Sequence, residues 1–324
     1  MRAGADPPRL SIEPRSLRSL RSPVVIRSRA GNEPGGMGMV AFVLEGGGSY
    51  GAAQIGMLNA LLDAGVTPDL IVGTSVGAMN GALLAARVDL RRSLDEMERM
   101  WRGIRRRDVL PVRPGSAVRA LMGRGSGLVP NAGLGRLIDR WLPVTRLEQL
   151  AVDFAAVATD IVSGEPVVLR RGVARTALLA SGALPGVYPP VHIDGRDLVD
   201  GGVTANFPVD VAAGLGATRI YALPTAVSAP SRLSGPFALV QRASDVLVAR
   251  ASRRALESTS GAVLVSEIPA PSTERSMFDF SGSAQLMDDG YEATRRWLAG
   301  PDAARVAPVD RRRSHTGAPR LALG

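Results

Sequence analysis

A glycine-flanked serine that directly follows an apolar run constrains the fold of this chain more than any other feature. Residues 70–72 (LIV) are typical of a buried strand, residues 73–77 (GTSVG) come next, and helix-forming residues follow. This order predicts a strand, a tight turn and a helix, with Ser75 at the tip of the turn. Such a turn holds the hydroxyl clear of the backbone, beside the positive end of the helix dipole. Ser75 is therefore the candidate nucleophile.

The residue inventory limits the bases that are available to this serine. The 324 residues include two histidines, no cysteine and no lysine. Thiol nucleophiles, thiolate metal sites, Schiff bases and serine–lysine dyads are therefore excluded. His315 stands in a tail of Arg, Pro, Gly and Ser, and His192 stands at an expected strand start, where a structural role is more common. A carboxylate is the favoured base, and an esterase that depends on His192 stays open as an alternative.

Strands and helices are expected to alternate through the central part of the chain. The expected strands are 40–44, 70–72, 153–159, 166–170, 219–223 and 262–268, and the expected helices include 78–86, 174–180 and 288–299. This alternation predicts an α/β fold with a mostly parallel central sheet and helices on both of its faces. Residues 91–140 read as helical and arginine-rich, which favours an insertion or a lid around the site.

The basic charge of the chain is concentrated at its two ends. Residues 1–39 carry seven arginines and three acids, and residues 301–324 carry five arginines and two acids, so residues 40–300 keep +2 of the net +9. We expect a disordered Arg/Pro-rich extension at 1–39, a globular domain at 40–300 and a disordered basic tail at 301–324. The weak charge of the central part gives no support to nucleic-acid binding.

Membrane-spanning and export signals are not evident in the sequence. No uninterrupted run of about 18 apolar residues is present, and the apolar patch near the N-terminus is too short for a signal-peptide core. We therefore expect a cytoplasmic protein, with reversible, peripheral contact with a membrane.

A glycine run follows the first expected strand and precedes a helix. Gly46, Gly47 and Gly48 let the backbone approach a ligand and point N–H groups at it, which beside a nucleophile forms an oxyanion hole. The spacing of Gly46, Gly48 and Gly51 also fits a dinucleotide fingerprint. That alternative requires an acid at the end of the second strand, whereas Asp69 stands at the start of that strand.

A candidate base follows a later apolar strand. Asp200 ends the run Leu198-Val199, and Gly201 and Gly202 come directly after it. Because parallel sheets place their sites at the carboxyl ends of the strands, we expect the Asp200 carboxylate to face the same crevice as Ser75.

Together these motifs resemble the patatin-like phospholipases, which are lipid acyl hydrolases with a Ser-Asp dyad. The resemblance covers about residues 40–300 and rests on residues 46–51, 73–77 and 200–202. Supporting similarity comes from residues 158–160 with 164–165, from 180–186 and from 206–208. The glycines that complete the three main motifs are Gly51, Gly73, Gly77, Gly201 and Gly202. Tyr50 departs from the family, which often has Arg or Lys at that position.

The resemblance implies a three-layer α/β/α sandwich in which Ser75 is the nucleophile, Asp200 its base and the Gly46–Gly48 amides the oxyanion hole. The implied function is a serine hydrolase that cleaves carboxylic esters of phospholipids or acylglycerols through an acyl-enzyme, without a metal or cofactor. Two alternatives remain open: the His192-dependent esterase, and a non-catalytic protein of the same fold that binds lipid or acyl carrier.

Overall fold

The computed structural model describes residues 38–111, 127–228, 236–259 and 263–301. Its centre is a mixed eight-stranded sheet in which seven strands follow the order β5-β6-β3-β2-β1-β7-β9, while β4 pairs with β3 outside this row. These strands are β1 (Val40–Leu44), β2 (Leu70–Thr74), β3 (Asp153–Asp160), β4 (Pro166–Leu169), β5 (Val191–Ile193), β6 (Arg196–Asp200), β7 (Arg219–Leu223) and β9 (Leu264–Glu267). A second, two-stranded sheet pairs β8 (Val227–Ser228) with β10 (Ser272–Thr273).

Helices follow most of the central strands. They are α1 (Ala52–Asp63), α2 (Val76–Ala85), α3 (Leu90–Gly103), α4 (Arg106–Val109), α6 (Ala132–Trp141), α7 (Ala174–Ser181), α8 (Val209–Gly214), α9 (Pro236–Thr259) and α10 (Ser283–Leu298). Short 3-10 turns occur at η1 (Gly48–Gly51), η2 (Leu147–Gln149), η3 (Gly201–Val203) and η4 (Phe280–Gly282).

The sheet has a parallel centre and an antiparallel edge. Strand β1 pairs in parallel with β2 and β7, β2 pairs in parallel with β3, and β7 pairs in parallel with β9. By contrast, β6 is antiparallel to β3 and β5 is antiparallel to β6. The prediction of a mostly parallel sheet is confirmed, although the edge that carries Asp200 runs the other way.

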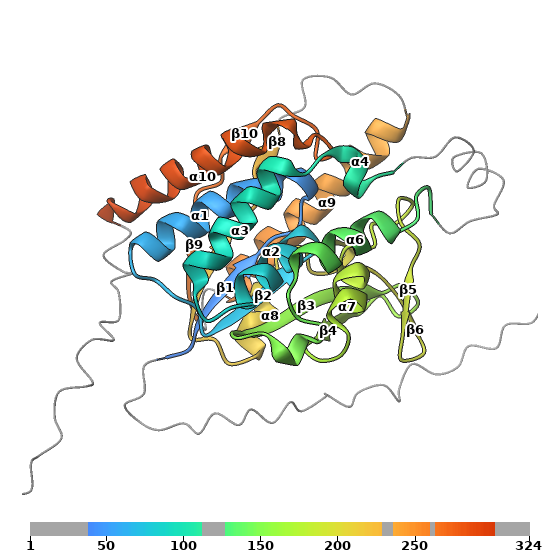
Figure 1. Cartoon of the computed structure of the whole chain (residues 1–324), viewed down its shortest axis with the longest axis horizontal. Helices are drawn as coiled ribbons and strands as arrows, with labels where there is room; N and C mark the ends of the chain where they lie inside the picture. The colour runs from blue at the N-terminus through green and yellow to red at the C-terminus, as the bar shows by residue number, and fades with distance from the viewer. Residues whose placement is uncertain (1–37, 112–126, 229–235, 260–262, 302–324) are drawn as a thin grey trace, which may run out of the picture. The chain divides into compact units, whose positions relative to one another are not determined.

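Alternating side chains of the central strands build two apolar layers, one on each face of the sheet. Phe42 and Leu44 of β1 pack with residues of α1, α2, α3 and α10. Ala41 and Val43 point the other way and pack with residues of α8 and α9. Figure 1 shows the sheet between these helices, with α1 and α10 side by side. The fold is thus the expected three-layer α/β/α sandwich, with a buried core on each side of the sheet.

The structure corrects the interpretation of residues 91–140 as an insertion or a lid for the part of that range that forms α3. Within α3, Leu94, Met97 and Trp101 are buried in the main core. The indole Nε1 of Trp101 donates a 3.0 Å hydrogen bond to Asn80 Oδ1 in α2. This helix therefore supports the one that follows the serine, because its apolar stripe packs inward while its arginines face solvent. The last helix, α10, begins at Ser283, five residues before its expected start.

Several predictions concern residues that the structure does not describe. Residues 112–126 lie outside the described ranges, and so do nearly all of the extensions expected at 1–39 and 301–324. The three-part division of the chain therefore stays a prediction. Within the described ranges, no helix has the length and hydropathy required to cross a membrane.

Candidate active site

Ser75 occupies a strained turn between β2 and α2. Its backbone dihedral angles are φ 54° and ψ −120°, in a region that residues other than glycine rarely adopt. The Ser75 N–H donates a 2.9 Å hydrogen bond to Ser181 Oγ, and the Ser181 hydroxyl donates a 2.6 Å bond to Val157 O on β3. A neighbouring helix and strand thus hold the turn in place, and the Ser75 side chain stays partly exposed.

The two glycines that flank the serine allow the strand and the helix to approach closely. A Cβ on Gly73 would lie 2.4 Å from Gly77 O, and a Cβ on Gly77 would lie 2.2 Å from Leu44 O of β1. Any side chain at either position would force the backbone apart. The glycine-serine-glycine pattern is therefore a packing requirement of this turn.

Asp200 contacts Ser75 from the end of β6. It is 4% exposed, and its Oδ1 accepts a 2.8 Å hydrogen bond from the Gly202 N–H. Burial raises the pKa of Asp200 to about 6, while hydrogen bonds from the Ser75 side chain and the Gly202 amide partly offset that rise. The carboxylate is still ionised at neutral pH, and it is a stronger base than an exposed aspartate.

The register of the sheet explains why these two residues meet. Thr74, the residue before the serine, pairs with Val157 of β3, and Asp200 pairs with the next residue of β3, Ala158. The expectation that Asp200 lies at the carboxyl edge of a parallel strand is wrong, because β6 is antiparallel to β3. Asp200 reaches Ser75 because β6 ends at the level of Ala158, on the opposite side of β3 from β2.

The glycine run lies directly against Ser75. A Cβ placed on Gly46 would lie 3.2 Å from Ser75 Cβ. The Gly46 N–H donates a 3.1 Å hydrogen bond to Asn206 O, so the prediction that this amide belongs to the oxyanion hole is wrong for this structure. The N–H groups of Gly47 and Gly48 remain as candidates, since no hydrogen bond of either N–H occurs within the described ranges.

Gly48 has φ +58°, and a Cβ there would lie 2.6 Å from Met277 O. The residues after it are anchored to the segment before α10: the Ser49 N–H donates to Met277 O at 2.8 Å, and the Tyr50 hydroxyl donates to Arg275 O at 2.7 Å. Tyr50, which stands where the family often has a cation, therefore ties the glycine run to this segment by a neutral hydrogen bond.

Two polar residues beside the glycine run were not predicted as site residues. Glu45 precedes Gly46, and its carboxylate accepts hydrogen bonds from Asn206 Nδ2 (3.1 Å), the Thr225 N–H (3.2 Å) and Ser252 Oγ (3.3 Å). Burial raises the pKa of Glu45 to about 7, these hydrogen bonds lower it, and the charge of Glu267 on β9 raises it further. Asn206 belonged to a supporting motif of the sequence, whereas nothing in the sequence marked Glu45.

The structure does not bring His192 to Ser75. The His192 side chain is 68% exposed on the β5–β6 hairpin, where its Nδ1 lies 3.0 Å from Asp197 Oδ1. Asp160 accepts hydrogen bonds from the Val162 N–H (2.9 Å) and the Ser163 N–H (3.3 Å), so its carboxylate stabilises the turn after β3.

The position of Asp69 does not support the alternative of a bound dinucleotide. Asp69 Oδ2 accepts a 2.9 Å hydrogen bond from the Val40 N–H and ties the starts of β1 and β2, so it is not placed to bind a ribose at the end of β2. Among the described residues, no group of three or more His, Asp or Glu side chains is placed to hold a metal ion.

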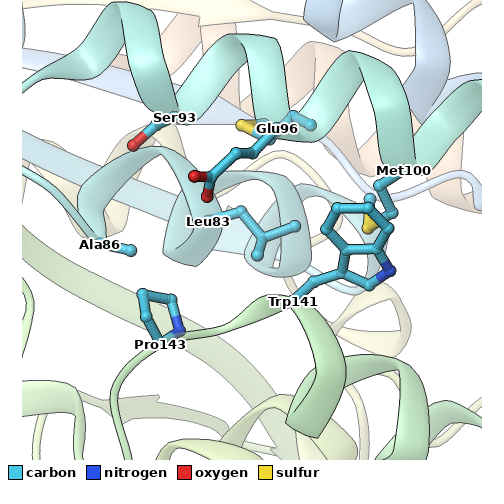
Figure 2. Close-up of a pocket in the computed structure, with 8 residues that line it drawn as sticks. Leu83, Ala86, Ser93, Glu96, Met100, Trp141 and Pro143 are labelled. Carbon is cyan, nitrogen blue, oxygen red and sulfur yellow. The ribbon is translucent and has the colours of Figure 1, made fainter.

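A small apolar pocket lies between α2, α3 and the end of α6 (Figure 2). Leu83, Met100 and Trp141 line it, and Ser93 Oγ is buried beside it without a hydrogen-bond partner in the described structure. The space suits about one water molecule and is too small for an acyl chain.

Comparison with known proteins gives the family of this chain. The chain belongs to the patatin-like phospholipase family, whose model matches residues 42–213. It is 32% identical to an uncharacterized NTE family protein of Mycobacterium tuberculosis, over 82% of this chain and 64% of that protein. It is 33% identical to patatin-like phospholipase domain-containing protein 7 of Rattus norvegicus, over 57% of this chain and 13% of that protein. The chain thus spans less than two thirds of the length of these relatives.

Two solved structures are more distant. VipD from Legionella pneumophila matches with a TM-score of 0.44 and 15% identity, over 81% of this chain and 67% of that one. Human GIVD cytosolic phospholipase A2, solved in complex with methyl gamma-linolenyl fluorophosphonate, matches with a TM-score of 0.39 and 14% identity, over 83% and 59%.

Proposed function

We propose that this chain is a serine lipid acyl hydrolase, which cleaves carboxylic ester bonds of phospholipids or acylglycerols through a dyad of Ser75 and Asp200. The observation that carries the proposal is the contact between a serine on a strained strand–helix turn and a buried aspartate. Membership of the patatin-like phospholipase family supports a lipid ester as the substrate.

The reaction follows from the positions of these groups. Asp200 accepts the hydroxyl proton as Ser75 Oγ attacks the ester carbonyl carbon. The N–H groups of Gly47 and Gly48 donate hydrogen bonds to the oxyanion that forms, and the positive end of the α2 dipole stabilises it further. The departing alcohol takes the proton from Asp200, and a water molecule then releases the acid from the acyl-enzyme by the same steps.

A lipid substrate requires contact with a lipid surface, and we assign that contact to the outer face of α9. Leu239, Val246 and Leu247 are 62%, 40% and 68% exposed. Helical spacing places Leu239, Val246, Arg250 and Arg253 along one side, opposite the buried Ser252.

Charge makes an anionic phospholipid surface the best match for this face. Between Leu239 and Arg254 the helix carries four arginines and one acid, Asp245. Exposed apolar side chains with flanking arginines are typical of helices that lie in the headgroup region of a bilayer. Ser252 on the opposite side bonds to Glu45, so this face lies on a helix that contacts the residue directly before the glycine run.

Turnover of phospholipid vesicles and of a water-soluble short-chain ester tests the proposal. We expect the wild-type chain to release fatty acid from both, the Ser75→Ala variant to release none, and a matched His192→Ala variant to keep nearly full activity. Loss of activity in His192→Ala with an intact fold would favour the histidine-dependent esterase. Vesicle binding without turnover of any ester by the folded wild-type chain would favour the non-catalytic lipid-binding alternative.

A further inference from the structure

Glu45 is a partly buried carboxylate that the acyl-transfer steps do not use. It joins the end of β1 to the glycine run, with its N–H bonded to Leu223 O (3.1 Å) and its O accepting from Gln54 Nε2 (2.9 Å). Removing a carboxylate from water is unfavourable unless several donors replace the lost hydration. Three donors do so here, and they come from three separate segments: Asn206, Thr225 and Ser252.

Asn206 links this carboxylate to both halves of the site. Its Nδ2 donates to Glu45 Oε1 at 3.1 Å and to Gly46 O at 3.3 Å, and its own O accepts the Gly46 N–H at 3.1 Å. Its Oδ1 lies 2.5 Å from the position of a Cβ on Gly46 and 3.0 Å from that of a Cβ on Gly202. The amide therefore fills the space between the glycine run and the turn that follows Asp200.

The same segment is also tied to the nucleophile. Thr74, the residue before Ser75, donates from its hydroxyl to Ala205 O at 2.7 Å. Thr225 Oγ1 donates a further 3.4 Å bond to Gly46 O, so two side chains that contact the glycine run hold the same carbonyl. The spacing between the Gly47 and Gly48 amides and the Ser75 hydroxyl therefore depends on this network.

We propose that Glu45, acting through Asn206, is a positioning residue that fixes the oxyanion-binding glycine run relative to Ser75 and Asp200. This inference rests on the function proposed above. Glu45 touches no reacting atom; it sets where the Gly47 and Gly48 N–H groups point when the oxyanion forms.

The protonation state of Glu45 controls this arrangement. Its three partners all donate hydrogen bonds, and the ionised carboxylate can accept all three. Protonation turns one carboxylate oxygen into a hydroxyl, which accepts these bonds less well. Glu267 on β9 is the charged side chain that adds to the effect of burial, while α9 contributes the neutral Ser252. With the pKa of Glu45 raised to about 7, the network is complete above neutral pH and loosens below it. Asp200, with a pKa of about 6, titrates separately at lower pH.

The decisive variant is Glu45→Gln, assayed over pH 5 to 9 on the water-soluble ester. The amide nitrogen of Gln would face the Thr225 N–H, donor against donor. We expect kcat to fall roughly 10- to 100-fold with KM within about twofold, because the substrate still binds while the transition state loses its aligned donors. We also expect the wild-type fall in kcat near pH 7 to disappear, which leaves only the fall near pH 6.

Two further variants complete the experiment. Glu98→Gln is the matched control, because Glu98 also accepts a hydrogen bond from an asparagine, Asn59, but between α3 and α1. It should keep the wild-type kcat and pH profile. Ser252→Ala removes one donor that lowers the pKa of Glu45, so it should move the upper inflection to higher pH with little change in kcat at pH 9. This milder change keeps the test possible if Glu45→Gln does not fold.

The outcomes separate the two proposals. An inactive wild-type chain would overturn the proposed function. An active wild-type chain with an unchanged kcat and the same two inflections in Glu45→Gln would overturn the positioning role alone. An unmoved upper inflection in Ser252→Ala would overturn it as well.

Discussion

The proposed nucleophile and its proposed base are held by different kinds of structure. Ser75 sits in a continuous strand–turn–helix, where Gly73 and Gly77 shape the turn and Ser181 bonds to its backbone. Asp200 sits at the end of β6, an antiparallel strand between β5 and β3, and depends on pairing with β3 for its place. A local turn generates the strain on the serine, whereas long-range pairing buries the carboxylate and raises its pKa. The two groups can therefore be disturbed independently.

Replacing Asp200, the proposed base, should give the largest effect on activity. We expect Asp200→Asn to lower kcat by roughly 10³-fold or more, because the amide cannot accept the serine proton. Asp197→Asn is the matched control, since it removes the carboxylate beside His192 on the exposed hairpin. Steady-state turnover of the soluble ester measures both. Equal losses in the two variants would contradict the assignment of Asp200.

Disturbing the turn should destabilise the fold as well as the site. Gly73→Ala places a methyl group 2.4 Å from Gly77 O, and we expect a loss of about 3 kcal/mol or more in the free energy of unfolding. Gly214→Ala at the end of α8 meets nothing within 4 Å and should change stability by less than about 1 kcal/mol. Urea denaturation compares them. A mild effect of Gly73→Ala would show that the turn tolerates a wider opening than the close contact implies.

Ionisation of the buried Asp200 carboxyl group should lower the free energy of unfolding as pH rises. Its folded pKa of about 6 exceeds the ordinary value of 3.8, so the unfolded chain ionises first and wild-type stability falls between about pH 4 and 6. Glu45, with its pKa raised from 4.5 to about 7, adds a loss of the same sign up to pH 7.

Asp200→Asn removes the cost of burying an ionised Asp200 carboxylate. The variant should therefore be more stable than the wild type at pH 8, by on the order of 3 kcal/mol. The difference should vanish below pH 4. Urea denaturation at the two pH values measures it, and a variant less stable than the wild type at pH 8 would contradict the burial of an ionised Asp200.

Substitutions on the outer face of α9 should affect only the binding and turnover of lipid at a membrane surface. We expect Arg250→Gln with Arg253→Gln to weaken binding to anionic phosphatidylserine vesicles by roughly 1 kcal/mol per arginine. Turnover of the water-soluble ester should not change. Vesicle sedimentation provides the measurement, with zwitterionic vesicles as the control. Unchanged binding to anionic vesicles would move the lipid contact to another surface.

The parts of the molecule that were predicted correctly are those whose signal is local. The turn at Ser75 can be predicted from the sequence because its strand, its two glycines and its helix are adjacent in the chain. Asp200 was identified by its motif, but the reasoning from parallel strand ends was wrong, since strand direction depends on pairing with β3.

The parts that were missed depend on contacts between distant segments. Glu45 meets Asn206 and Ser252 across separations of 161 and 207 residues. The backbone oxygen that accepts the hydrogen bond of the Gly46 N–H also belongs to Asn206. No local sequence pattern predicts the contacts of Glu45 or the hydrogen bond of the Gly46 N–H. The arginines of α3 suggested a surface lid, whereas its buried stripe of Leu94, Met97 and Trp101 decides its place in the core.

The most direct test of the dyad is reaction of the full chain with a fluorophosphonate probe, followed by mass spectrometry of the labelled peptide. We expect a single phosphonylated residue, Ser75, with no labelling in Ser75→Ala and strongly slowed labelling in Asp200→Asn. Labelling at another serine, or no labelling of the folded wild-type chain, would contradict it.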